Sequence, residues 1–435
     1  MAARASMAER FDAVVVGAGP AGSAAALALA KEKFSVLLVE RGRTAGSKNM
    51  FGGRVYAWPL FDLLPEWQKD CPVERFVTRE SLAFLSGDAS LSVQFENPAS
   101  TSGRAASFTA LRPKFDEWLA KKAEAAGATL ITGIKVDELL REGGKVRGVV
   151  AGPDKIAANV VVLAEGAMGP LAQKAGLLPE LAPKAVSVGV KETVELPAAT
   201  IQERFALGEK EGAAVVYAGD ASMGLRGGGF LYTNKASVSL GLVVSSEDLA
   251  RKKVEVQEVM ERFRLHPSIQ RLLKGGKVGE YSAHLVPELG LGMRAKYIAD
   301  GVLLAGDAAG FLINNGYTFR GVDLAIASGI AAARAAVDAR ARGDFSAAGL
   351  ASYDRHLRAL NVLTDLERFR STGGYLKNER LFSLYPKLLL GITEKVYTVD
   401  GSGKERISDV VLQEMKGKAP LFKMLKDFLD AARSM

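Results

Sequence analysis

Residues 11–40 read FDAVVVGAGPAGSAAALALAKEKFSVLLVE, and this stretch decides the fold of the chain. A short apolar run rich in valine predicts a buried strand that stops at Gly17, and an alanine- and leucine-rich segment predicts a helix that runs to about Lys31. A second apolar run then ends in Glu40. Strand, helix and strand in this order predict the β-α-β unit of a Rossmann-type domain.

Three glycines follow the first strand at the spacing GxGxxG, namely Gly17, Gly19 and Gly22. In dinucleotide-binding domains the first allows a tight turn, the second lets a pyrophosphate approach the backbone, and the third lets the helix pack on the strand. The free N–H groups at the helix N-terminus favour phosphate there. Glu40, about 20 residues further on, is placed to accept hydrogen bonds from ribose hydroxyls. This unit predicts a bound dinucleotide, with NAD as compatible as FAD.

Composition narrows the class of protein. The 435 residues suffice for two or three domains, and 48% hydrophobic with 24% charged residues is ordinary for a globular chain. The single cysteine, Cys71, excludes a disulfide framework and any four-cysteine zinc or iron–sulfur site within this chain. The three histidines lie far apart and are expected to be structural. We therefore expect no metal site.

The net charge of +8 and pI near 9.3 are compatible with nucleic acid, an anionic membrane surface or an acidic partner. No basic run interleaved with aromatic residues is present, so nucleic acid is not expected. The first ten residues lack the apolar core of a signal peptide, and no stretch reaches about 20 uncharged apolar residues. These features predict a cytoplasmic protein that is soluble or peripheral on a membrane.

The texture of the sequence changes along the chain and predicts an α/β protein. We expect a Rossmann-type nucleotide-binding domain that carries an inserted, largely antiparallel β-sheet domain and ends in helices, with one charged helix over about 247–264 and an alanine-rich helix over 321–342. The expected divisions are a disordered lead-in (1–10), the first part of the nucleotide-binding domain (11–185), the inserted domain (186–295), the second part (296–345) and a helical C-terminal region (346–435).

Two basic stretches are candidates for contact with a phosphate or a cofactor ring. The segment TAGSKNMFGGR, which contains Lys48, Gly53 and Arg54, is expected to be a binding loop rather than regular structure, with a flexible surface loop as the alternative. Arg112 precedes a helix that has Pro113 in its first turn, so its side chain could point back at a phosphate. An exposed salt bridge is the alternative for Arg112.

A second signature stands far downstream, in DGVLLAGDAAGF at residues 300–311. A short buried strand ends at Gly306 and Asp307, where a carboxylate can accept hydrogen bonds from a polyol chain. A helix N-terminal region is expected around 314–321, where partial positive charge would stabilise the N1/C2=O edge of a reduced flavin. An aspartate that caps a helix is the alternative. Together with the GxGxxG unit, this signature predicts a two-part FAD site.

These motifs resemble a known family. GAGPAG with Glu40, KNMFGG, LRPKFD, AEGA and DGVLLAGDAAGF resemble the glutathione-reductase-type FAD proteins of the hydroxylase branch, over residues 11 to about 400. YSAHLVPELG, TFRGVDLAIASGIAAA and YPKLL are similar to the FixC-type relatives of electron-transfer-flavoprotein:quinone oxidoreductase. The resemblance implies FAD-binding roles for Gly17, Ala18, Gly19, Pro20, Ala21, Gly22, Glu40, Arg41, Lys48, Gly53, Arg112, Val136, Glu165, Gly166, Gly306, Asp307 and Gly321.

The resemblance also implies a function. FAD would take electrons from the subunits of an electron-transfer flavoprotein and pass them to a membrane quinone, as in the exergonic branch of the electron-bifurcating FixABCX complexes of nitrogen fixation. A chain with one cysteine would need a separate ferredoxin-like iron–sulfur subunit. No acid–base residue is required for this electron transfer. The expected location is peripheral, on the inner face of the cell membrane.

Two segments are candidates for the quinone path. Residues 227–232, GGGFLY, are expected to form one wall of an apolar channel, with a turn and core strand as the alternative. Residues 382–392, FSLYPKLLLGI, could lie on a membrane surface or form an ordinary packed helix. Three other functions stay open: a prenyl reductase of the geranylgeranyl-reductase type, although its aromatic-proline motif is not evident; a flavin monooxygenase; and a structural subunit whose FAD does not turn over.

Overall fold

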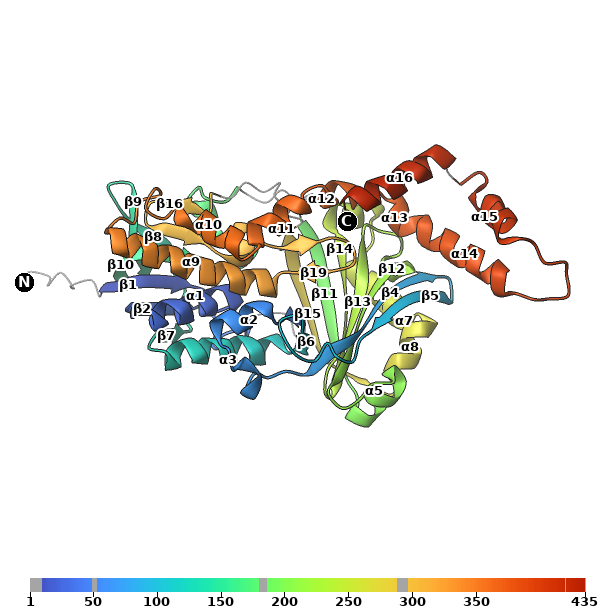
Figure 1. Ribbon diagram of the computed structural model, residues 1–435, viewed down its shortest axis with the longest axis horizontal. Helices are drawn as coiled ribbons and strands as arrows, with labels where there is room; N and C mark the ends of the chain where they lie inside the picture. The colour runs from blue at the N-terminus through green and yellow to red at the C-terminus, as the bar shows by residue number, and fades with distance from the viewer. Residues whose placement is uncertain (1–9, 49–52, 180–185, 288–295, 419, 435) are drawn as a thin grey trace, which may run out of the picture.

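The computed structural model describes residues 10–48, 53–179, 186–287, 296–418 and 420–434. Figure 1 shows two sheets side by side, with the last helices projecting beyond the second sheet. Each sheet has its own hydrophobic core. Residues 1–9 of the expected lead-in (1–10) and most of the KNMFGG loop lie outside the described residues, and Arg10 already belongs to the first strand.

The first sheet carries the predicted β-α-β unit, β1 (Arg10–Val16), α1 (Pro20–Lys31) and β2 (Val36–Glu40). Its strand order is β16-β17-β10-β1-β2-β7, and the five strands from β17 to β7 run parallel. The hairpin of β8 and β9 is attached to β10. The other strands are β7 (Thr129–Thr132), β8 (Glu138–Glu142), β9 (Lys145–Ala151), β10 (Asp154–Leu163), β16 (Ile298–Ala299) and β17 (Val302–Leu304).

Helices pack on this parallel sheet, and its central strands are almost wholly buried, as parallel strands covered by helices should be. Helix α1 packs against both α9 and α3. The helices of this part are α2 (Trp58–Leu63), α3 (Arg112–Ala125), α4 (Pro170–Lys174) and α9 (Val322–Arg342). Helix α9 confirms the alanine-rich helix expected over 321–342, and helix α3 begins at Arg112 itself, one residue earlier than the sequence suggested.

The second sheet has nine strands, in the order β15-β11-β14-β13-β12-β4-β6-β3, with β5 paired to β4. All its pairings are antiparallel except that of β12 with β4. Its strands are β3 (Gly53–Tyr56), β4 (Arg75–Ser86), β5 (Ala89–Glu96), β6 (Ser107–Ala110), β11 (Val186–Glu195), β12 (Glu211–Gly219), β13 (Gly227–Thr233), β14 (Ser237–Ser245) and β15 (Lys277–Pro287).

This sheet is not built from residues 186–295 alone, because strands β3 to β6 come from residues 53–110. The parallel pairing of β4 with β12 joins segments more than a hundred residues apart, and no local pattern signals such a pairing. Helices α5 (Ala198–Phe205), α7 (Val256–Leu265) and α8 (Pro267–Leu273) lie on the side of the sheet away from the first domain (Figure 1). Helix α6 (Ser246–Lys252) packs on β11 and β14.

The single charged helix expected over 247–264 is wrong, since α6 and α7 are separate helices. Lys253 ends α6 in the left-handed conformation, with φ of +53°. A non-glycine residue there breaks the run of helical backbone, although charge periodicity continues across the break.

A short irregular segment links β17 to α9: a 3-10 turn at Gly306–Ala309, then the two-residue strands β18 (Ile313–Asn314) and β19 (Phe319–Arg320). The chain ends in helices, as predicted: α10 (Ser352–Ala359), α11 (Val362–Arg368), α12 (Thr372–Tyr375), α13 (Arg380–Ser383), α14 (Tyr385–Tyr397), α15 (Ile407–Met415) and α16 (Leu421–Ser434).

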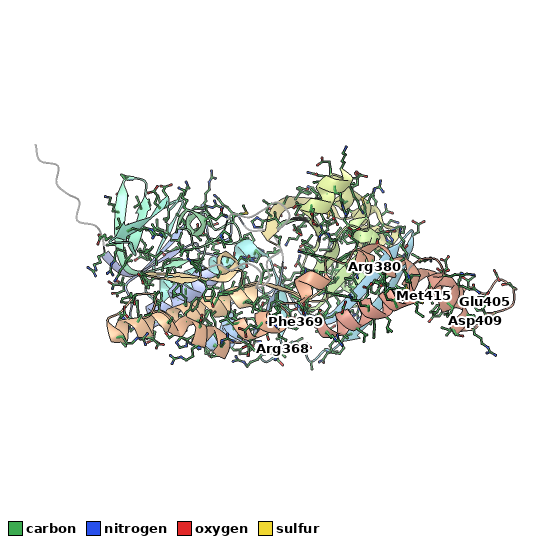
Figure 2. The ribbon with its side chains drawn as sticks, turned by 90° about the horizontal axis from the view of Figure 1, so that it is seen from above. Arg368, Phe369, Arg380, Glu405, Asp409 and Met415 are labelled. Carbon is green, nitrogen blue, oxygen red and sulfur yellow. The ribbon has the colours of Figure 1, made fainter. Side chains whose placement is uncertain are left out.

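Helices α14 to α16 form a projecting arm. Figure 2 shows Arg380 at its base, and Glu405 and Asp409 at its outer end. A bidentate ion pair from Arg380 to Asp427, with both hydrogen bonds 2.7 Å long, ties α16 back to α13. Helix α14 also packs on β4, β5 and β12, whereas α15 packs on α14, so the arm is held along α14 and projects at α15.

Candidate functional site

The GxGxxG turn has the geometry that each glycine predicts. Gly17 has φ of +101°, and a Cβ there would overlap the carbonyl oxygen of Ala164. A Cβ on Gly22 would overlap the carbonyl oxygen of Gly17, so this glycine lets α1 lie directly on the turn. Gly19 is different, because nothing of the chain lies within 4 Å of the position that a Cβ would take there. The open side of Gly19 faces the cavity described below, at the N-terminus of α1.

Glu40 stands at the end of β2 and holds this turn. Its Oε2 accepts a 2.9 Å hydrogen bond from the backbone N–H of Ala18, and its Oε1 accepts a 2.6 Å bond from that of Gly42. A carboxylate has about four acceptor positions, so capacity remains for ribose hydroxyls. Because Glu40 also lines the cavity, one side chain can both fix the loop and contact a nucleotide.

Asp307 lines the same cavity as this turn, in the 3-10 turn that follows β17. Burial raises the pKa of its carboxyl, and the positive charges of Arg112 and His284 oppose that rise. Gly321, which precedes the first residue of α9, lies against Asp307 Oδ1, so carboxylate and helix N-terminus stand side by side. The predicted second half of the site is thus assembled near the first.

Arg112 and Glu165 both line the cavity, and both have partners within the chain. Arg112 donates from Nε and Nη2 to the buried Asp116 at 2.8 and 2.9 Å, within one helix. This ion pair is largely buried and so differs from the exposed salt bridge of the alternative. Glu165 accepts hydrogen bonds from the N–H groups of Leu171 and Ala172 and so caps α4. Both side chains therefore already use part of their hydrogen-bonding capacity within the chain.

The cavity itself measures about 860 Å³ and brings together most of the predicted residues. This volume lies within the range of ligand pockets, roughly 300–1,000 Å³. All predicted positions line it except Ala18 and Gly22, which support the turn from behind. The lining set is Gly17, Gly19, Pro20, Ala21, Glu40, Arg41, Lys48, Gly53, Arg112, Val136, Glu165, Gly166, Gly306, Asp307 and Gly321.

Arg54 departs from the expectation of a loop contact without regular structure. It lies in β3, where its guanidinium pairs with Glu80 through a 2.7 Å bond from Nη1 to Oε2 and stacks 4.3 Å from the ring centre of Tyr56. It still reaches the cavity wall. A smaller cavity of about 290 Å³ adjoins at this point and shares Arg54, Tyr232 and Phe319 with the large one.

Sequence reasoning missed the part of the wall that the nine-stranded sheet supplies. Lys191 on β11 and His284 on β15 both face the cavity, although His284 was expected to be purely structural. Lys191 is 6% exposed, and burial together with the nearby Arg112 lowers its pKa to about 7. Burial also lowers the pKa of His284. The one available signal was a lysine inside the apolar strand VSVGVKETV.

Residues 227–232 lie on strand β13, and their alternate side chains face the cavity, as the channel-wall hypothesis requires. The rings of Phe230 and Tyr232 stack with centres 5.2 Å apart. The cavity continues from there to Phe382 at the base of the arm. One continuous space thus joins the nucleotide turn, the sheet face and the C-terminal helices.

The residues fit FAD. A side chain at Gly17 or Gly22 would overlap backbone atoms, whereas Gly19 is open to a pyrophosphate. Glu40 and Asp307 place carboxylates where ribose and ribityl hydroxyls need acceptors. In the part of the chain that the structure describes, no group of three or more potential ligands could hold a metal ion.

Comparison with known proteins agrees with this site. A family model described as FAD dependent oxidoreductase matches residues 12–87 and 109–335, and the model of the ETF-QO/FixC family C-terminal domain matches residues 374–435. A structure described as geranylgeranyl bacteriochlorophyll reductase-like, from Thermoplasma acidophilum, has a TM-score of 0.70 at 22% identity, covering 96% of this chain and 99% of that one. The flavin-dependent brominase Bmp2 has a TM-score of 0.64 at 18% identity, covering 94% and 100%. These likenesses show the fold, and fold and site together define an FAD-dependent oxidoreductase.

Curated relatives show to which family of FAD-dependent oxidoreductases the chain belongs. The chain is 45% identical over 427 residues to a probable electron transfer flavoprotein-quinone oxidoreductase, YdiS, of Escherichia coli K12, covering 98% of this chain and 99% of the relative. It is 46% identical over 417 residues to the protein FixC of the same strain, covering 96% and 97%. The chain belongs to the ETF-QO/FixC family.

Proposed function

We propose that this protein passes electrons from an electron-transfer flavoprotein through FAD to a membrane quinone, as the FixC-like subunit of an electron-bifurcating complex. The observation that carries the proposal is the continuity of the cavity, which runs from the nucleotide turn at Gly19, past Asp307 and the sheet face at Phe230, to Phe382. An acceptor could therefore approach the flavin along an apolar wall without crossing the nucleotide-binding end.

The arm supports an approach from a membrane. In the described chain no helix is long and apolar enough to cross a bilayer, yet the arm exposes an unusual number of large apolar side chains. Such a surface marks an interaction site on a soluble chain. The exposed residues are Tyr397, Val399, Ile407, Leu412, Leu421, Phe422, Leu425, Phe428 and Leu429.

The segment 382–392, for which the sequence allowed either membrane contact or an ordinary packed helix, exposes little apolar surface. In α14, Pro386, Leu388 and Leu390 are buried, and within that segment only Leu389 is exposed among the large apolar residues. We therefore place the proposed peripheral contact on α15, α16 and the loop before them. Lys423 and Lys426 of α16 would face the anionic surface of the inner leaflet.

FAD, when bound, supplies reversible one- and two-electron chemistry. The chain's residues bind and orient it: the Gly17–Gly22 turn and the N-terminus of α1 hold the pyrophosphate, and Glu40 and Asp307 hold hydroxyl groups. The N-terminus of α9 at Gly321 supplies partial positive charge beside Asp307. Transfer of the electrons themselves needs no acid–base group. A single cysteine, Cys71, means that an iron–sulfur cluster of the complex would need a ferredoxin-like partner subunit.

Affinity purification from the native host tests the assembly. The proposal predicts that flavoprotein subunits and a small iron–sulfur protein co-purify with the yellow chain. In an activity assay, NADH alone should reduce the flavin slowly, whereas a reduced electron-transfer flavoprotein with a quinone analogue should turn over. Rapid, substrate-stimulated NAD(P)H oxidation with oxygen uptake would instead identify a monooxygenase, and saturation of an isoprenoid double bond would identify a prenyl reductase.

A further inference from the structure

We propose that Lys191 donates a proton to the electron acceptor that binds on the sheet side of the cavity. This inference rests on the proposed function, since it concerns the acceptor's half of that reaction. Quinone reduction consumes two protons as well as two electrons, and reoxidation of a singly protonated reduced flavin releases only one proton, so the acceptor needs one further proton donor. Lys191 is an ionisable side chain of the sheet that is buried and also lines the cavity.

The register of three strands explains how Lys191 reaches the cavity. Lys191 on β11 pairs with Gly241 on β14, which in turn pairs with Phe230 on β13. A Cβ on Gly241 would overlap the ring of Phe230, so this glycine leaves room for the ring and for the lysine beside it. The ammonium nitrogen of Lys191 lies 5.7 Å from the ring centre of Phe230, at the distance of a cation–π contact.

The same strands offer a platform for a planar acceptor. Phe230 and Tyr232 stack at an interplanar angle of 27° and both line the cavity. Offset stacking on such a pair suits a flat, electron-poor ring such as a quinone. A quinone that lies on these rings would bring a carbonyl oxygen toward the ammonium group of Lys191.

The charges around Lys191 suit a group that gives up and regains a proton. Arg112, at the start of α3, opposes its protonated form, and Glu280 on the edge strand β15 favours it. Glu280 is half-buried, so it can pass protons between solvent and lysine. β14 presents no titratable side chain between Ser237 and Ser245. The packed strands also carry His284 on β15 and Tyr232 on β13. Glu192, Tyr281 and Arg264 lie on the opposite face, and Glu195 pairs with Lys277 at the far end of β11 and β15.

Electrons and protons balance in this step. Reduced FAD, when bound, would supply two electrons and one proton. An N–H bond of the Lys191 ammonium breaks as an O–H bond forms on one quinone carbonyl, which leaves a neutral amine. Water at the open end of the cavity carries the proton released by the flavin to the other carbonyl oxygen, and quinol leaves. Solvent then restores the ammonium group through Glu280. A positioned acid with a pKa near the working pH contributes typically 10²–10⁴-fold.

Two substitutions separate proton donation from charge. Lys191→Met removes both, whereas Lys191→Arg keeps the positive charge but cannot release a proton near neutral pH. Both variants should retain FAD and accept electrons from a reduced flavoprotein at the wild-type rate. Both should reduce a soluble quinone analogue about 100-fold more slowly in kcat/KM. Their pH profiles should also lose the fall in rate that wild type shows above neutrality.

A readout independent of turnover is the titration of the side chain itself. In protein labelled with ¹⁵N-lysine, one side-chain signal should titrate near neutrality and be missing in Lys191→Met. Lys277→Met, an exposed change on β15, is the matched control and should leave all measurements unchanged. Full recovery of quinone reduction in Lys191→Arg, an unaffected Lys191→Met, or the absence of such a titrating signal would overturn the inference.

Two further results keep the test decisive. If Lys191→Met does not fold, Glu280→Gln should slow quinone reduction several-fold and shift its pH profile, and no shift would count against the relay. If wild-type protein reduces no quinone with any reduced flavoprotein, the proposed function fails. In that case the lysine titration still shows whether the group is the predicted acid.

Discussion

Glu40 joins two tasks at one residue. Its carboxylate holds the N–H groups of Ala18 and Gly42, and so sets the turn against which a pyrophosphate would lie. The same side chain borders the cavity where a ribose would be recognised. Loss of the carboxylate should therefore destabilise the turn in the flavin-free protein, because a buried N–H without a partner costs about 1–3 kcal/mol. It should also remove a contact to bound FAD.

Glu40→Ala should weaken FAD retention by about 10-fold or more, since both the turn and the ribose contact lose an acceptor. The FAD dissociation constant is measured from the flavin fluorescence that is recovered on dilution. Glu142→Ala, at the exposed end of β8, serves as the control. Equal FAD affinity in Glu40→Ala and wild type would remove this role from Glu40.

Asp307 gives a pH-dependent prediction. Burial raises the pKa of its carboxyl above 3.8, so in flavin-free protein the folded state binds this proton more tightly than the unfolded chain does. Below pH 3.8 this difference does not change the free energy of unfolding. As pH rises through the raised pKa, the free energy of unfolding decreases. Asp307→Asn should thus stabilise the flavin-free protein at pH 7.

Thermal unfolding of the flavin-free proteins at pH 7 and at pH 4 measures this effect. The advantage of Asp307→Asn should shrink toward the acidic end, while FAD retention should fall because a charged acceptor is lost. A constant difference in Tm across pH would show that ionisation of Asp307 is not responsible.

At the scale of elements, the glycine turn shows two kinds of constraint. Gly22 is required by the chain itself, because any Cβ there would overlap the Gly17 carbonyl. Gly19 has no such neighbour, so its lack of a side chain is needed only by a ligand. One helix start therefore carries a folding requirement and a binding requirement three residues apart.

The matched variants Gly19→Ala and Gly22→Ala should separate these requirements. Gly19→Ala should keep the wild-type Tm without FAD but lose most FAD binding, whereas Gly22→Ala should unfold at lower temperature, with a cost of about 2 kcal/mol or more. Calorimetry of the flavin-free proteins and FAD titration measure the two effects. A Tm loss in Gly19→Ala as large as in Gly22→Ala would contradict this division.

Elements that depend on local pattern were predictable from sequence, and elements that depend on distant pairing were not. The β-α-β unit and α9 follow from periodicity and caps, and the two motif regions meet in one cavity as expected. The contribution of β3 to β6 to the second sheet rests on the parallel pairing of β4 with β12. Lys191 was missed for the same reason, since its place beside Phe230 exists only across three paired strands.

At the scale of the whole molecule, the projecting arm of α14 to α16 belongs to neither of the two sheets. It is anchored by the Arg380–Asp427 pair, yet α16 presents an exposed apolar stripe that includes Phe422, Leu425 and Phe428. The arm lies beyond the second sheet (Figure 1), and the cavity ends at its base. This arrangement suits a surface that docks on lipid and admits an apolar acceptor.

Paired substitution on α16 tests the membrane contact. Phe422→Ser with Phe428→Ser should lower binding to vesicles that contain phosphatidylglycerol by about 10-fold, because two aromatic side chains no longer enter the interface. Co-sedimentation measures it, with Tm and FAD content as checks on folding. Unchanged vesicle binding, or loss of binding to a flavoprotein partner instead, would assign the surface to a protein.

The central claim is that electrons cross this protein from a flavoprotein to a quinone. An anaerobic stopped-flow experiment tests it directly: FAD-loaded protein is mixed with reduced electron-transfer flavoprotein, and a quinone analogue is then added. We expect the flavin absorbance to bleach in the first step and to return in the second, with one quinol formed for each flavin reoxidised. A flavin that is not reduced by the flavoprotein, or that stays reduced in the presence of quinone, would contradict it.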